Sequence, residues 1–465
     1  MVLYSTLKCF IFSIPDKMKY HEAIKNVNIA NIFRRKNYLR RSSPHKVCLL
    51  IFLWSSIWIF YILKTNYEVM LSHSEKAPLL NHSSSKMDSL NEEGASACLI
   101  IKDDNPRLIE WIAYHYQILP LRRLIITSDP SAFTSPTEIL ERWRKIVADL
   151  EIIEWTEEDY EFDRTWAKLK ARETKLGSDP SYVAEYELVA RQRGFYSSCA
   201  SYIKENGGTW VYIIDVDEYV VFNTIHEDDP TKSEELTKFL TMMKPLKRYR
   251  KRTNIWKTNH EDGLMNLRRK LPDIGSKSVM EFIKEIKDDP FSPFTKSPSY
   301  TMPRLFFSAQ ELKESEISRF DGLQGIDSTI RLDTLRFFKH AEKGAFPWNR
   351  YGKSMIDVSR IPIQHLKPFV HEHQGVGYND DFESIFYSQS LLRIHHYLGS
   401  WEAYKRPDDD RRSKVDFERK AYVDHGIPLY DTIPWVDAFI ENVGIVNAKA
   451  LLEGSGDHRW KQAYW

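Results

Sequence analysis

Short apolar runs and amphipathic stretches alternate along the chain from residue 96 onward. Three runs have the length and composition of buried strands, and they lie at 98–101, 124–129 and 150–155. Apolar side chains at helical spacing fill the stretches between them, after Asn105-Pro106 and over 136–147. Asn105 is the predicted N-cap of the first helix, and Pro106 suits its first turn. The alternation predicts an α/β domain with a mostly parallel, doubly wound sheet.

A further apolar run, Thr209–Tyr219, ends in the carboxylates Asp215, Asp217 and Glu218. It follows a predicted helix over 181–206 and reads as a buried strand. Carboxylates at the end of such a strand are costly to bury without a cation, and ligands of open α/β sheets bind at that edge. Asp215 and Asp217 are therefore candidate ligands of a divalent cation that also binds substrate phosphates. A solvated strand end is the alternative.

Acidic residues also follow the two earlier strands that lead into helices. Asp103 comes after the run at 98–101, and Asp129 ends the run at 124–129. If the crossovers are right-handed and the strands parallel, these carboxylates lie at the same sheet edge as Asp215.

The first 95 residues differ from the rest. Residues 1–46 carry ten Lys and Arg residues against two acidic ones, and residues 47–63 form an uncharged run rich in Ile, Leu, Phe and Trp. That run is long enough for one membrane anchor; a buried helix or a cleaved signal peptide is the alternative. The positive-inside rule places the tail in the cytosol and the remaining chain in a lumen. The polar residues 64–95 are the predicted stem.

The charge and cysteine content narrow the function classes. The net charge of +1 combines +8 in residues 1–46 with −7 in the rest, which argues against nucleic acid as a partner of the folded part. Residues 96–465 are predicted to form one large domain, with 225–297 as an insertion near the acceptor. Four cysteines are too few for a disulfide framework. Cys98 and Cys199 fall in the folded part, where one pair is compatible with an oxidising lumen.

Later segments carry groups suited to phosphate and metal. Arg350 and Lys353 are candidate phosphate contacts, and ordinary surface cations are the alternative. His395 and His396 follow a strand-like run, and adjacent strand residues face opposite ways, so at most one of them points at a given metal. A histidine beside two carboxylates suits manganese; a hydrogen-bonded structural histidine is the alternative.

Two stretches, Cys98–His115 and Trp210–Tyr219, together resemble glycosyltransferase family 92, galactosyltransferase-like type II membrane proteins of the secretory pathway. Weaker matches lie at 301–307, 352–358, 370–371 and 395–397. The resemblance implies a GT-A fold, a Mn²⁺-dependent nucleotide-sugar donor, expected to be UDP-galactose, and inversion at the anomeric carbon. Two departures are Asp104, where the family usually has Glu, and the missing glycine soon after Tyr114-His115.

The resemblance also assigns residue roles. Asp215, Asp217 and His396 would bind the metal, and Asp104 would lie beside the nucleoside. Gln192 matches a glutamine that the family carries on the helix before the Asp-x-Asp strand. Cys98 and Cys199 match positions where the family often has cysteines.

The resulting hypothesis is a Golgi, single-pass type II, metal-dependent glycosyltransferase that acts on a glycan acceptor. The catalytic base is open among Asp321, Asp327, Glu372, Asp380 and Asp381. Asp380 and Asp381 are favoured because they follow a Gly-x-Gly turn. The rivals are a non-catalytic lumenal glycan-binding protein with the same fold and a metal-dependent phosphotransferase or hydrolase. The absence of Gly-rich phosphate loops and zinc-type motifs disfavours kinases, dinucleotide enzymes and zinc peptidases.

Overall fold

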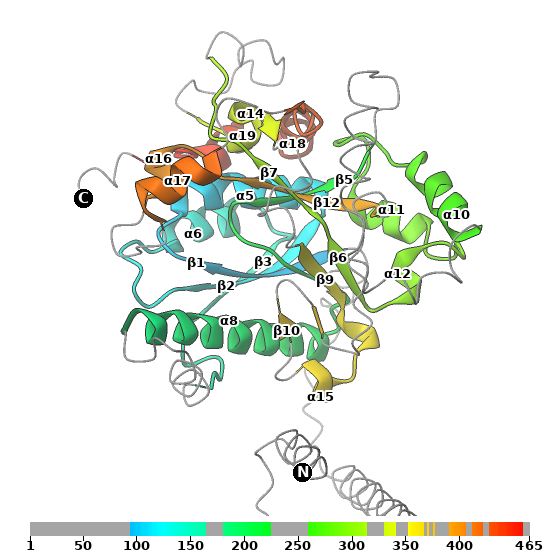
Figure 1. The fold of residues 1–465 in the computed structure, drawn as a ribbon, viewed down its shortest axis with the longest axis horizontal. Helices are drawn as coiled ribbons and strands as arrows, with labels where there is room; N and C mark the ends of the chain where they lie inside the picture. The colour runs from blue at the N-terminus through cyan, green and yellow to red at the C-terminus, as the bar shows by residue number, and fades with distance from the viewer. Residues whose placement is uncertain are drawn as a thin grey trace, which may run out of the picture. The chain divides into compact units, whose positions relative to one another are not determined.

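The computed structural model describes residues 94–163, 180–224, 259–313, 330–340, 352–366, 370–371, 375–376, 390–405, 412–421 and 427–458 (Figure 1). All of them belong to one compact unit, Ser84–Trp465. The predicted tail 1–46, the anchor 47–63 and the stem as far as residue 93 lie outside the described residues. Within the described segments, no helix is long and apolar enough to cross a membrane.

A six-stranded sheet forms the centre of this unit, in the order β3-β2-β1-β4-β9-β6. Its strands are β1 (Ala95–Ile101), β2 (Leu121–Ser128), β3 (Glu151–Trp155), β4 (Trp210–Ile213), β6 (Ser299–Met302) and β9 (Lys353–Asp357). The neighbours β3, β2, β1 and β4 pair in parallel, whereas β9 runs antiparallel to β4 and β6. The predicted α/β fold with a mostly parallel sheet is therefore confirmed.

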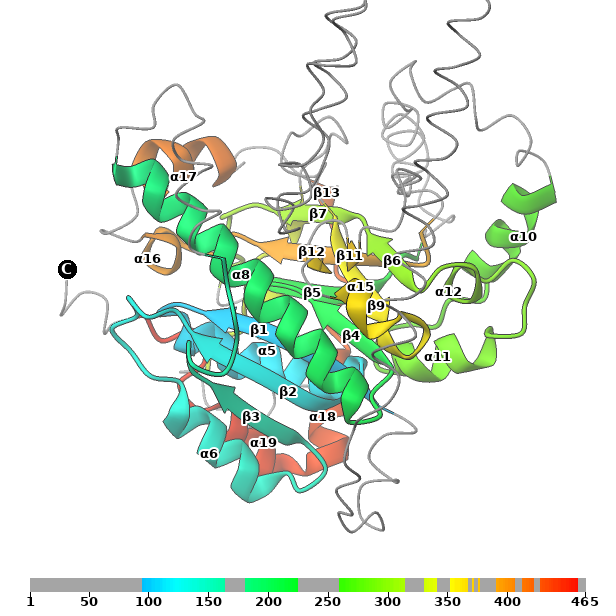
Figure 2. The ribbon, with the colours of Figure 1, turned by 90° about the horizontal axis from the view of Figure 1, so that it is seen from below.

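Helices cover both faces of the sheet. They are α5 (Asn105–Ile118), α6 (Thr137–Ile146) and α8 (Pro180–Glu205). Figures 1 and 2 show α8 along one face, with α5 and α6 on the other. Successive side chains of β4 point to opposite faces of the sheet. Val211 packs in the cluster that contains Phe195 and Ile203 of α8. Its neighbour Tyr212 belongs to the larger cluster around α5, as expected for a sheet buried on both faces.

A second, mixed sheet has the order β13-β8-β7-β12-β5. Its strands are β5 (Glu218–Phe222), β7 (Arg304–Phe307), β8 (Lys339–His340), β12 (Leu392–Tyr397) and β13 (Ile427–Pro428). The predicted single strand Thr209–Tyr219 is thus two strands, β4 and β5, which belong to different sheets. Residues 214–217 connect them, so the acidic residues lie where the chain leaves one sheet for the other.

The remaining elements are shorter and surround the two sheets. They are α10 (Asn259–Arg268), α11 (Val279–Glu285), α12 (Pro293–Lys296), α14 (Asp333–Arg336), the 3₁₀ turn η5 (Val358–Arg360), α15 (Ile363–Leu366), β10 (Val370–His371), β11 (Gly375–Val376), α16 (Trp401–Tyr404), α17 (Lys414–Ala421), α18 (Trp435–Val443) and α19 (Ile445–Leu452). Leu267, Phe282 and Phe294 of the predicted insertion belong to the main hydrophobic core. The described part of 225–297 is therefore packed into the domain.

Helix α5 begins one residue earlier than the sequence predicts. Asp104 is the N-cap, with Asn105 and Pro106 in the first turn. Asp103 immediately before it has a φ of 52°, a left-handed conformation that Asp adopts more readily than most residues. This conformation reverses the chain between β1 and α5 and brings Asp104 to the carboxyl edge of the sheet.

The side chains of α5 cap the outer edge of β5, the last strand of the second sheet. Tyr114 donates its hydroxyl to the Val220 carbonyl at 2.9 Å, and the Val220 amide donates to His115 Nε2 at 3.4 Å. His115 Nδ1 lies 2.8 Å from the Trp111 carbonyl. Because Nε2 accepts, Nδ1 carries the proton and donates. Edge-strand groups that would otherwise be unpaired are satisfied in this way.

A disulfide joins the central strand β1 to α8. Cys98 and Cys199 are bonded across a sequence separation of 101 residues, and both are fully buried. The pairing of these two cysteines, which the sequence left open, is therefore present. It holds α8, which leads into β4, against the face of the sheet.

Removing this disulfide is expected to destabilise the domain. For a closed loop of about 100 residues, the loss of the cross-link costs roughly 4–5 kcal/mol through the entropy of the unfolded chain. The double variant Cys98→Ala/Cys199→Ala should show this loss in urea unfolding. A reducing agent should lower the midpoint of the wild type and leave that of the double variant unchanged. An insensitive wild type would contradict the assignment.

Acid is expected to destabilise the domain through His115. Burial lowers the pKa of His115 from 6.5 to about 3. Between these values the unfolded imidazole binds a proton that the folded one does not. The stability that His115 contributes is therefore present above about pH 6.5 and is lost towards pH 3, at about 1.4 kcal/mol per pH unit. Urea unfolding of His115→Gln between pH 7 and 4.5 should show a shallower decline than the wild type; equal slopes would contradict the neutral imidazole.

Candidate functional site

The turn between β4 and β5 places two carboxylates at the carboxyl edge of the parallel strands. The turn is closed by two hydrogen bonds, from Glu218 N to the Asp215 carbonyl at 3.1 Å and from Asp215 N to Glu218 Oε2 at 3.0 Å. Trp111 of α5 also donates to the Asp215 carbonyl at 3.0 Å. The backbone of the turn is therefore fixed by the turn itself and by the helix beneath it. Asp215 remains 39% exposed, and Asp217 is 15% exposed.

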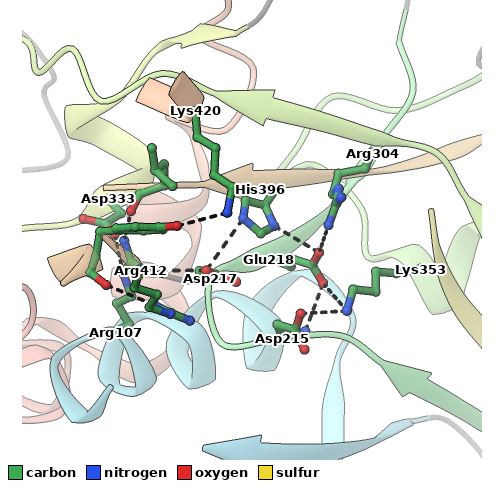
Figure 3. A network of polar contacts seen from close by, with 12 residues as sticks. Arg107, Asp215, Asp217, Glu218, Arg304, Asp333, Lys353, His396, Arg412 and Lys420 are labelled. Carbon is green, nitrogen blue, oxygen red and sulfur yellow. Dashed lines mark hydrogen bonds and ion pairs between the residues drawn. The ribbon is translucent and has the colours of Figure 1, made fainter. Parts of the chain in front are cut away.

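Glu218 is a fully buried carboxylate surrounded by two cationic side chains and a histidine. Figure 3 shows Arg304, Lys353 and His396 converging on it. The separations are 3.3 Å to Arg304, 3.4 Å to Lys353 Nζ and 3.1 Å to His396 Nδ1. Burial opposes the ionisation of Glu218, but Lys353, His396 and Arg304 outweigh it and hold the pKa well below its usual value. Glu218 is thus an ionised carboxylate inside the protein.

Lys353 lies at the start of β9, beside β4. Its side chain is 1% exposed, and Nζ is 2.7 Å from Asp215 Oδ2. A buried ammonium needs such partners, and Asp215 and Glu218 provide them. The structure thus places Lys353 against the carboxylates of the turn, and its contact with phosphate remains a prediction.

Arg107 holds Asp217 from the other side. It is buried on the first turns of α5, and its guanidinium lies 3.5 Å from Asp217 Oδ2 and 3.0 Å from Asp333 Oδ2. It also donates to the Leu398 carbonyl at 2.6 Å. Burial disfavours its charge, but Asp333, Asp217 and Asp104 outweigh burial and raise the pKa of Arg107.

The residue after Leu398 must be glycine for Arg107 to fit. Gly399 has a φ of 73°, and a Cβ there would lie 2.0 Å from Arg107 Nη2.

Sequence reasoning missed the roles of Arg107, Arg304 and Asp333. An arginine within the apolar helix was the one available signal for Arg107.

His395 and His396 face opposite sides of β12, as the strand spacing predicts. His395 is fully buried and accepts from Arg393 Nε at 2.9 Å, and burial, with Arg393 nearby, lowers its pKa well below the usual value. His396 pairs in register with Glu218. Its ring stacks on Phe306 at 4.4 Å, and its Nε2 lies 3.7 Å from Asp217 Oδ2. Only His396 therefore faces the turn.

Two of the three predicted manganese ligands lie close together, and the third points elsewhere. Among the described residues, no three His, Cys, Asp or Glu side chains are grouped so as to hold a metal ion. Asp217 and His396 do face each other at 3.7 Å. Two donors that each lie about 2.1 Å from one ion can be as much as about 4.2 Å apart, so this pair fits one cation. Asp215 is directed at Lys353 and is exposed enough to turn away from it.

The other predicted residues are distributed as follows. Asp104 is buried at the N-terminus of α5, and Gln192 is half-buried on α8. Its neighbour Arg191 pairs at 3.3 Å with Asp129 at the end of β2. Asp103 accepts from the amides of the loop at 133–134, at 2.7 and 2.9 Å, so that carboxylate is structural. Outside the described residues lie Arg350, Asp321, Asp327, Glu372, Asp380 and Asp381.

A cavity of about 1250 Å³ lies at the opposite edge of the sheet. Gly94, Pro120 and Thr209, which precede β1, β2 and β4, line one side of it, and residues around α11 line another. Since β1, β2 and β4 are parallel, this edge is separated from the acidic turn by the length of the strands. The cavity is therefore not part of the candidate site.

No protein-family model matches the chain, and no curated protein matches it. Its functional assignment therefore depends on the residues around the β4–β5 turn and on the motifs that they carry.

Replacing Lys353 is expected to destabilise the domain. Lys353→Met keeps the length of the side chain but leaves buried Glu218 with one cation fewer, and breaking a buried ion pair costs about 3–5 kcal/mol. Glu141→Gln is the matched control, because it breaks a largely exposed pair with Arg144 that is worth less than about 1 kcal/mol. Urea unfolding measures both. Equal losses in the two variants would contradict the role of Lys353 in the buried cluster.

Proposed function

We propose that this protein is a metal-dependent glycosyltransferase with a GT-A fold, which moves a sugar from a nucleotide-sugar donor to a glycan acceptor. The observation that carries the proposal is the sheet-crossing turn, where Asp215 and Asp217 lie at the carboxyl edge of the parallel strands and His396 faces Asp217. UDP-galactose as the donor and inversion of configuration are the expectations of the family resemblance.

When the sugar is transferred, a nucleoside diphosphate is the leaving group, and its negative charge must be neutralised. Asp217 and His396, joined by Asp215, would hold Mn²⁺, and the ion would supply that neutralisation. The protein's own contribution is to hold these metal ligands in place. Arg107 fixes Asp217 and Glu218 holds His396, whereas Lys353 compensates the charge of Asp215, whose exposed side chain can turn towards the ion.

The other residue roles in this proposal come from the sequence and from the family resemblance. Asp104, at the N-terminus of α5, would lie beside the nucleoside, and Gln192 of α8 would contribute to the same donor site. The acceptor hydroxyl requires a general base, for which Asp380 and Asp381 remain the candidates. Arg350 remains a candidate phosphate contact.

The proposed location is the Golgi membrane, with the catalytic domain in the lumen. The Cys98–Cys199 disulfide gives limited support, since such bonds persist in oxidising compartments. The predicted anchor at 47–63 and the basic tail before it supply the single-pass type II orientation.

The proposal is tested with a panel of nucleotide sugars and Mn²⁺. The full chain should transfer sugar only when the ion is present, and Asp217→Asn should lower the rate by roughly 100-fold or more in a variant that thermal unfolding shows to be folded at the assay temperature. Asp149→Asn is the control, because Asp149 lines the cavity at the opposite edge of the sheet and should leave the rate unchanged. Full activity of Asp217→Asn would contradict the site. A thermal midpoint that rises with glycans alone, and not with UDP and Mn²⁺, would indicate a glycan-binding protein without transfer activity.

A further inference from the structure

The contact between Glu218 and His396 determines which nitrogen of the imidazole carries the proton. Glu218 Oε1 is 3.1 Å from His396 Nδ1. The other oxygen, Oε2, accepts from Asp215 N at 3.0 Å and lies 3.4 Å from Lys353 Nζ. Arg304 reaches Oε1 at 3.3 Å. These four groups are donors or cations, which is the environment of an ionised acid.

An ionised carboxylate only accepts hydrogen bonds. The hydrogen bond to Glu218 therefore requires a proton on His396 Nδ1. In the neutral imidazole this leaves Nε2 without a proton and with its lone pair available. Nε2 is the atom that faces Asp217 Oδ2 at 3.7 Å.

Two acceptors then face each other across the candidate site. A lone pair on Nε2 and a carboxylate oxygen cannot hydrogen-bond to one another, and a cation between them would satisfy both. The ring is also fixed in orientation, because it stacks on Phe306 with ring centroids 4.4 Å apart. Glu218 in turn is held by Arg304 and Lys353, so it cannot readily turn away from Nδ1.

We infer that Glu218 is a positioning residue that fixes the Nδ1–H form of His396 and presents the free Nε2, opposite Asp217, to a divalent cation. This inference rests on the proposed function in the choice of cation, whereas the protonation pattern of the ring does not depend on it. Carboxylates that orient metal-binding histidines in this way commonly change metal affinity by 10- to 100-fold when removed.

The tautomer is measured in the wild type, which avoids any loss of folding in a variant. The full chain is labelled with ¹³C and ¹⁵N in histidine only, and His396 is assigned by its absence in His396→Asn. At pH 8 the ring carbon and nitrogen shifts should be those of the Nδ1–H form. The Nε2–H form would overturn the inference.

Mn²⁺ alone is the probe that tests whether Nε2 of His396 binds a divalent cation. The free-ion electron paramagnetic resonance signal gives its affinity, and spin-echo modulation from ¹⁵N-histidine reports a directly bound ring nitrogen. Glu218→Leu should bind Mn²⁺ about 10- to 100-fold more weakly, whereas Glu218→Gln, whose amide oxygen can still accept from Nδ1–H, should recover part of the loss. Glu281→Gln, which alters the capping carboxylate of α11, is the control, with unchanged affinity.

The outcomes separate this inference from the proposed function. The Nδ1–H form with a bound histidine nitrogen, in a protein that transfers no sugar, supports the role of Glu218 and contradicts the glycosyltransferase. Sugar transfer by a protein whose His396 carries its proton on Nε2 supports the function and overturns the role of Glu218. Equal Mn²⁺ affinities of wild type and a folded Glu218→Leu would also overturn it, with folding checked by thermal unfolding.

Discussion

The buried carboxylate of Glu218 is the interaction on which the candidate site depends. It lies at the first residue of β5, where the chain has just left one sheet for the other. An isolated charge in this position would be strongly unfavourable. Lys353 from the first sheet and Arg304 from the second compensate the charge, and His396 of the second sheet hydrogen-bonds to the same carboxylate. One side chain thereby connects the two sheets at the point where they meet, and the exposed carboxylates of the turn are held beside it.

Helix α5 supports this junction from below. Trp111 binds the backbone of the turn, and Tyr114 and His115 bind the outer edge of β5. Arg107 reaches Asp217 and Asp333. The backbone amides of Asp333 and Thr334 donate to Glu110 at 2.6 and 3.0 Å, and burial together with the nearby Asp333 raises the pKa of Glu110 to about 7. A single helix therefore sets the position of the turn, of the edge strand and of α14.

The candidate site is rigid around the buried carboxylate and more open at the Asp215 side chain. The buried residues Glu218, Lys353 and Arg107 are fixed by several partners each, whereas the Asp215 side chain is 39% exposed. Preorganised charged groups of this kind lose little energy in rearrangement when a ligand binds. The disulfide between β1 and α8 adds to the same rigidity on the opposite face of the sheet.

The amino-acid pattern alone predicts the alternating strands and helices, the acids at the ends of the strands and the opposite orientations of His395 and His396. These features are local, since they follow from the periodicity of neighbouring residues. The pattern also predicts α5, although the N-cap is Asp104 and not the predicted Asn105. The strand that begins near Thr209 does end at the acidic residues, but the sequence did not predict that the chain continues as β5 in a second sheet, because no local pattern marks a change of sheet.

The residues that surround the carboxylates are set by long-range packing. The partners of the site are far apart in the chain: Glu218 and Arg304 are separated by 86 residues, Asp215 and Lys353 by 138, and Arg107 and Asp333 by 226. No spacing in the sequence encodes such contacts, because the charge of a residue is local whereas its compensation depends on which distant strands pack together. The sequence thus placed the acids at the sheet edge, and the packing of two sheets on one helix determined which of them are exposed and which are buried with a cation.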